Sequence, residues 1–80
     1  IMNNYIQGTM VNLREPILDS LRSHYQGQID KHKANVEIYL NNPVGIGEHP
    51  DVTGAIADQI AEIAKYDEQL GILEKYFLGK

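Results

Sequence analysis

The sequence predicts an all-α protein, an antiparallel helical hairpin that dimerises into a four-helix bundle. Large apolar residues recur every three or four positions on both sides of one interruption, as in amphipathic helices. That interruption, residues 42–50, contains two prolines and two glycines. The chain has 80 residues, which is too few to bury a large core, so self-association is expected.

Residues 1–14 show no sustained period and are interpreted as an N-terminal arm, whereas residues 15–80 form the hairpin. The first helix is expected over residues 16–41, because Pro16 suits a first helical turn and Asn12 or Glu15 could cap it. Its apolar stripe comprises Leu18, Leu21, Tyr25, Ile29, Val36, Tyr39 and Leu40.

The second helix is expected over residues 51–78, beginning near Pro50 or Asp51, where an acidic side chain favours the positive end of the helix dipole. A heptad seam is formed by Ile56, Ile63, Leu70 and Phe77, with Ile60, Tyr66 and Leu73 at the alternate steps. Antiparallel packing then pairs Val36 with Ile56, Ile29 with Ile63, and Leu21 with Leu70.

A second seam of small residues follows the same helix: Ala57, Ala61, Ala64 and Gly71. Alanine is the best helix former and needs no partner. Small side chains also let another helix approach closely. We favour a homodimer through this seam, because a lone hairpin has almost no interior and would leave Ile38, Ile72 and Tyr76 in solvent.

The loop at residues 42–50 carries two aliphatic side chains, Val44 and Ile46, that a simple turn does not need. They either fold over the open end of the bundle as a plug or present an apolar knob to another protein. We favour the plug, because Gly45 and Gly47 allow the backbone to turn Ile46 inward.

His32 lies in the apolar stripe of the first helix, opposite Ile60 and within reach of Gln59. Such a histidine is typically a satisfied core or interface group, and it could fix the register or make association sensitive to pH. Arg22 with Asp67 or Glu74 is expected to form an ion pair between the helices.

Enzyme chemistry finds little support in the sequence. There is no cysteine, no phosphate-binding glycine loop of recognised spacing and no histidine pair at four-residue separation on a helix. We therefore predict no catalytic residue and no cofactor. Glu48, His49 and Asp51 match no ligand pattern, so no metal site is predicted. No signal peptide or membrane span is expected, which predicts a cytoplasmic protein.

The motifs "LRSHYQGQIDKHKANVEIYLNNPVGIGEHPDV" and "AEIAKYDEQLGILEKYF" resemble small uncharacterised proteins of tailed phages that infect cyanobacteria and other marine bacteria. These proteins share a helix, a loop similar to "NPVGIGEHPD" and a second helix ending near an aromatic residue. The resemblance implies a viral source and expression in the host cell cytoplasm, and it implies no activity or functional residue.

The function expected from these features is that of a non-enzymatic interaction or accessory protein, packing its helices against itself or against a host or phage protein. The candidate interaction residues are Val44, Ile46, Ala57, Ala61, Ala64 and His32. The alternative is a nucleic-acid-associated factor that touches phosphates through Arg14, Arg22, Lys31 and Lys33. Nucleic acid is the less favoured partner, because these cations are dispersed and the chain carries a net charge of −4.

Overall fold

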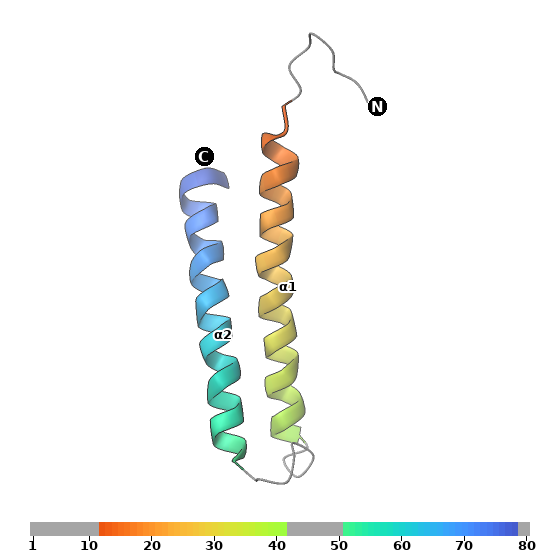
Figure 1. Ribbon diagram of the computed structural model, residues 1–80, viewed down its shortest axis with the longest axis vertical. Helices are drawn as coiled ribbons and strands as arrows, with labels where there is room; N and C mark the ends of the chain where they lie inside the picture. The colour runs from red at the N-terminus through yellow and green to blue at the C-terminus, as the bar shows by residue number, and fades with distance from the viewer. Residues whose placement is uncertain (1–11, 42–50, 79–80) are drawn as a thin grey trace.

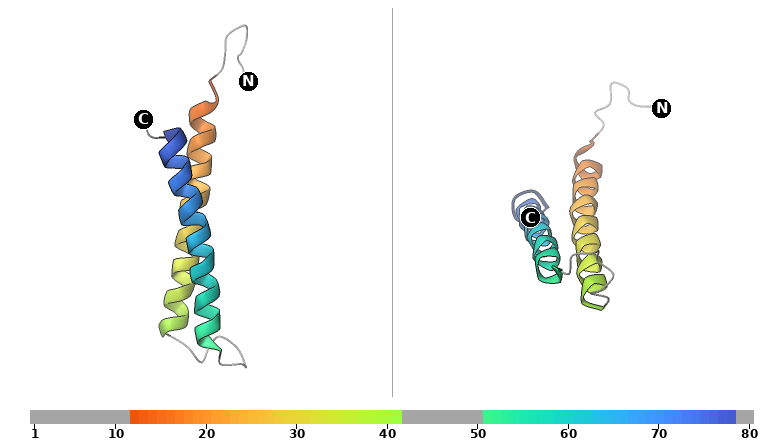
Figure 2. Two further views of the ribbon diagram at one scale, coloured as in Figure 1. Left: turned by 90° about the vertical axis from the view of Figure 1, so that its left-hand side faces the viewer. Right: turned by 60° about the horizontal axis from the view of Figure 1, so that its bottom comes forward.

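The computed structural model describes residues 12–41 and 51–78. Helix α1 spans Arg14–Asn41, helix α2 spans Val52–Leu73, and α2 continues into a π-helical segment, η2, over Glu74–Leu78. The helices run antiparallel and side by side (Figures 1 and 2). The all-α hairpin is therefore confirmed. The end with Arg14 and Leu78 is called the terminal end, and the end with Asn41 and Val52 the loop end.

Side chains of asparagine fix both ends of α1. The Asn12 Oδ1 atom accepts a hydrogen bond from the Arg14 backbone N–H at 2.9 Å, which satisfies one of the donors that a helix start leaves free. Pro16 lies in this first turn, where its missing N–H costs nothing. At the other end, Asn41 Nδ2 donates to the Glu37 carbonyl at 2.6 Å. Of the two caps that the sequence left open, Asn12 and Glu15, the structure has Asn12.

Helix α2 begins at an aspartate cap. The Asp51 carboxylate accepts a hydrogen bond from the Gly54 backbone N–H at 2.9 Å. Gly54 allows this close approach, since a Cβ atom there would lie 2.8 Å from the Asp51 Cγ atom. The expected helix start near Asp51 is therefore correct.

The π-helical segment η2 changes which side chain at the end of α2 packs inward. Phe77, placed in the seam by the heptad pattern, is 52% exposed, so that prediction is wrong. Leu78 packs against the core instead. A π-helix has more residues per turn than an α-helix, which shifts the inward position by about one residue. Arg14 Nη2 also donates to the Phe77 carbonyl at 3.1 Å, which links the two helices at the terminal end.

The core of the hairpin is thin. Among the described residues the buried apolar side chains are Ile29, Leu70 and Leu73. Around these pack the half-buried residues Leu18, Tyr25, Ile63, Tyr66 and Leu78. No described side chain is less than 2% exposed. Ile29 and Ile63 meet in this cluster, as the antiparallel register requires.

Two sequence-based expectations about the seam are wrong. Ile60 is 53% exposed, and Gln59 faces α1 in its place. The reason is the spacing: counting back seven residues from Tyr66 gives Gln59, not Ile60. Within residues 12–41 and 51–78 the one salt bridge joins Glu62 and Lys65 inside α2, so Arg22 forms no ion pair with Asp67 or Glu74.

Removing the cap of α2 tests this account of its first turn. We expect Asp51→Ala to lower the free energy of unfolding by about 1 kcal/mol, because the Gly54 N–H loses its acceptor, and Asp51→Ser to recover most of that loss. Urea denaturation measures both. Asp58→Ala is the matched control, since it removes an exposed aspartate within the same helix. Equal losses for Asp51→Ala and Asp58→Ala would contradict the cap.

Candidate interaction surface

A layer of polar side chains, the central polar layer, joins the helices near their middle: His32, Asn35 and Gln59. His32 is 8% exposed, and its Nδ1 atom lies 2.6 Å from Gln59 Oε1. Asn35 Nδ2 donates to the same oxygen at 3.0 Å. An amide oxygen only accepts, so the hydrogen of this pair resides on His32 Nδ1. The predicted burial of His32 and its contact with Gln59 are confirmed.

Aromatic rings cover the central polar layer on its side nearer the terminal end. The His32 and Tyr66 rings stack with 6.1 Å between centroids and 10° between planes. The His24 ring meets Tyr66 edge-on at 6.0 Å, and Tyr25 lies 6.5 Å from Tyr66. Lys65 Nζ lies 4.6 Å from the Tyr66 ring centroid. These contacts hold His32 in place.

Glu62 and Lys65 form a surface pair close to this layer, with 3.0 Å between Lys65 Nζ and Glu62 Oε1. The hydrogen bond and positive charge of Lys65 lower the pKa of Glu62, and the hydrogen bond to Glu62 raises the pKa of Lys65. Both side chains are largely in water, so the pair stabilises the fold very little. It does keep this part of the hairpin surface charged.

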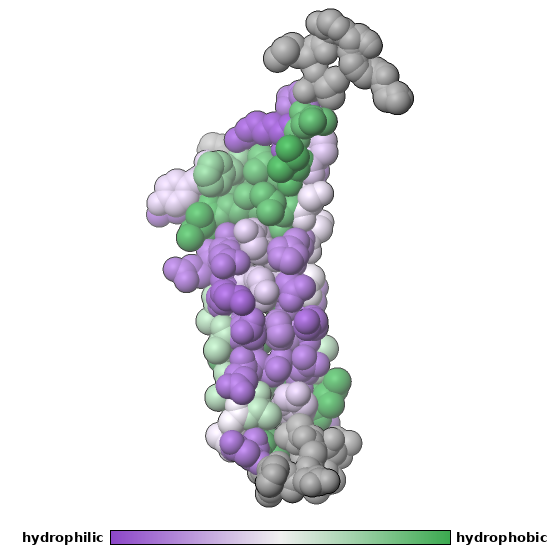
Figure 3. Space-filling model, in the orientation of Figure 1, coloured by the Kyte–Doolittle hydropathy of each residue, from purple (hydrophilic) through white to green (hydrophobic). Residues whose placement is uncertain are grey.

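The terminal end of the hairpin exposes a group of large apolar side chains, the terminal apolar patch. Its members are Leu13, Ile17, Leu21, Ile72, Tyr76 and Phe77, with exposed fractions from 37% to 63%. In Figure 3 apolar side chains gather at this end, and a belt of polar ones lies below them. The patch comes from both helices, so only the folded hairpin assembles it.

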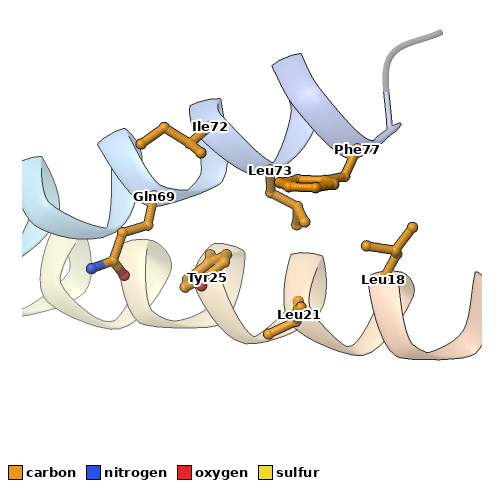
Figure 4. A pocket seen from close by; sticks show the side chains of 7 residues that line it. All are labelled: Leu18, Leu21, Tyr25, Gln69, Ile72, Leu73 and Phe77. Carbon is orange, nitrogen blue, oxygen red and sulfur yellow. The ribbon is translucent and has the colours of Figure 1, made fainter. Parts of the chain in front are cut away.

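A groove of about 280 Å³ crosses the terminal apolar patch (Figure 4). Its lining comprises Leu18, Leu21, Tyr25, Gln69, Ile72, Leu73 and Phe77. In Figure 4, Leu73 from α2 and Leu18 from α1 point into the space between the two helices. A groove with almost wholly apolar walls is suited to receiving apolar side chains of another helix.

The small-residue seam of α2 is open to solvent. Ala57, Ala61 and Ala64 are all exposed. A separate hollow of about 250 Å³ near the middle of the hairpin is lined by Lys33, Ala34, Val36, Glu37, Ile60 and Ile63. The structure therefore does not bring the seam, His32 and the terminal apolar patch into one site. Val44 and Ile46, the remaining candidates, lie outside the described residues.

The described part of the chain offers no group of three or more histidine, aspartate or glutamate side chains that could hold a metal ion. Neither of its helices is long and apolar enough to cross a membrane. Comparison with protein-family models, with curated proteins and with solved structures finds no match. The surface itself must therefore carry any functional argument.

Sequence reasoning identified only part of the terminal apolar patch. It noted that a lone hairpin would leave Ile72 and Tyr76 in solvent, and both are exposed in the single chain, but it assigned Leu21 and Phe77 to the seam. Ile17 received no role. The sequence did contain a signal for the patch. Ile17 and Leu21 are four residues apart, as are Ile72 and Tyr76, and residues at this spacing lie side by side on one face of a helix. Each helix therefore carries one apolar pair near the terminal end.

The central polar layer predicts a specific cost for losing Gln59. We expect Gln59→Ala to lower the free energy of unfolding by about 1–3 kcal/mol, because His32 Nδ1 and Asn35 Nδ2 both lose their acceptor. Thermal or urea unfolding gives the value. The matched control is Gln26→Ala, which removes an exposed hydrogen bond to Asp30. If Gln59→Ala and Gln26→Ala lower the free energy of unfolding by the same small amount, the central polar layer does not stabilise the register.

Two helical glycines test whether the small-residue face is free. A Cβ atom at Gly27 or Gly71 would meet nothing within 4 Å. Gly27→Ala should therefore raise the free energy of unfolding by about 0.5–1 kcal/mol through helix propensity. Gly71→Ala should give the same gain if its face is open. A loss of stability or of association for Gly71→Ala alone would show that another helix packs on the seam.

Proposed function

We propose that the protein is a non-enzymatic helical interaction protein, which acts by packing its helices against a second copy of itself and so forms a four-helix bundle. The terminal apolar patch carries this proposal. Six large side chains of the patch are 37% to 63% exposed, while only three apolar residues of the described chain are buried. Exposed apolar surface of this kind, contributed by two helices, marks a protein interaction site.

The thin core supports a second copy as the partner. The chain has 80 residues, and among those that the structure describes only Ile29, Leu70 and Leu73 are buried apolar side chains. Small domains with so little buried apolar surface are commonly stabilised by association with copies of themselves.

The terminal apolar patch is a stronger interface candidate than the small-residue seam. Removing a large aliphatic or aromatic side chain from water contributes about 1.5–3 kcal/mol, whereas an alanine contributes far less. The resemblance to phage proteins supports a setting inside an infected bacterial cell.

A nucleic-acid-associated function has weaker support. Arg14 is already engaged with the Phe77 carbonyl, and Lys33 lies beside Glu37 in the lining of the mid-hairpin hollow. Salt separates the two functions, because phosphate binding weakens as salt rises. Association of two chains that each carry a net charge of −4 through apolar surface should instead hold or strengthen.

A single charge in the groove tests the proposed function. We expect light scattering to show a dimer for the parent protein and a folded monomer for Ile72→Glu, because the glutamate would be buried without a partner. Ile38→Glu is the control: Ile38 is 57% exposed near the loop end, and this variant should remain dimeric. A parent chain that is monomeric and well folded at every concentration tested would refute self-association.

A further inference from the structure

We infer that the two copies meet head to head, with terminal end on terminal end, so that their loop ends point in opposite directions. This inference rests on the proposed function. It specifies which part of the hairpin surface the two copies bury against each other and the symmetry that relates them. It starts from the position of the terminal apolar patch, which occupies one end of the hairpin and not its whole length (Figure 3).

The stripes that carry the patch turn polar toward the middle of the hairpin. Continuing from Leu21 at three- and four-residue steps, the α1 stripe consists of His24, Gln28, Lys31 and Asn35. From Ile72 in the opposite direction, the α2 stripe consists of Gln69, Lys65, Glu62 and Asp58. Residues at these steps share one helix face. The same face is therefore apolar at the terminal end and polar along the middle of the hairpin.

Symmetry limits how two such faces can meet. A twofold dimer uses the same surface on both copies. If the hairpins overlapped fully in opposite directions, each apolar patch would lie against the loop end of the other copy, and the charged stripes of both copies would be covered between the two ends. If they overlapped fully in the same direction, Lys31, Glu62 and Lys65 of both copies would lose water, which costs more than their pairing is expected to return.

Head-to-head contact avoids both costs. The terminal apolar patches cover each other, and the charged stripes remain in water. A twofold axis across the hairpin sets each helix antiparallel to its own counterpart, so that Ile17 of one copy approaches Leu21 of the second copy. The four helices then pack together only over the terminal part of each hairpin. The four-helix bundle is therefore shorter than the helices that form it.

Distances between identical labels test this arrangement. The chain has no cysteine, so Ser20→Cys and Asp58→Cys each introduce one spin-label site at an exposed position. The His32–Gln59 contact sets Asp58 level with Lys33, about 20 Å along the axis from Ser20 at 1.5 Å per residue. With the twofold axis near Ser20, the Asp58 pair should be at least about 40 Å apart, and the Ser20 pair clearly closer.

Each outcome decides between the possibilities. Full overlap in either direction, or contact through the small-residue seam, would give an Asp58 pair no longer than the Ser20 pair, which overturns the head-to-head arrangement and leaves the proposed function standing. A parent chain with no intermolecular distance at either site overturns both. Adding Ile72→Glu to each labelled chain should abolish the distances, with circular dichroism confirming that the helices persist.

Discussion

The hydrogen bonds on Gln59 Oε1 are the constraint on which the rest of the hairpin depends. Apolar side chains alone would tolerate several alignments of two long helices, because one leucine or isoleucine can replace another at the seam. His32 and Asn35 find a shared acceptor only where Gln59 faces them. Sliding one helix by a heptad would set Tyr66 or Val52 opposite His32 and leave buried donors unpaired, at a cost of about 1–3 kcal/mol. The buried polar group therefore selects the alignment, as a polar residue does in coiled coils.

That alignment also determines which apolar residues remain outside. With the register set in the middle, the terminal end brings together Leu21, Ile72 and Phe77 around a groove that two helices cannot fill. The turn of π-helix over Glu74–Leu78 adds to this by directing Leu78 inward and leaving Phe77 half exposed. A thin core and an uncovered apolar end have the same origin: two helices pack along one line of contact, and large side chains beside that line need a further helix. The proposed association of two copies supplies it.

Much of the fold follows from local sequence signals. The two helices, the start of α2 near Asp51 and the antiparallel register all depend on neighbouring residues or on a simple spacing, and the structure agrees with them. The wrong seam assignments arose where a residue was chosen for its hydrophobicity and not for its position in the seven-residue repeat. Ile60 seemed a better seam residue than polar Gln59, although only Gln59 keeps the seven-residue step. Phe77 was wrongly assigned to the seam because no sequence pattern used here predicts a π-helical turn. The seam alanines and the loop residues Val44 and Ile46 depend on a partner or lie outside the described residues, so their roles remain predictions.

Hydrogen exchange measured at several protein concentrations tests most directly whether a second copy covers the terminal end. If it does, amides of the last α2 turn and η2, around Leu73 and Tyr76, should exchange more slowly as the concentration rises. Amides around His32 and Gln59 lie beyond the contact and should show a much smaller change. Exchange rates that are independent of concentration throughout, or a slowing centred on Ala57–Ala64, would contradict this account.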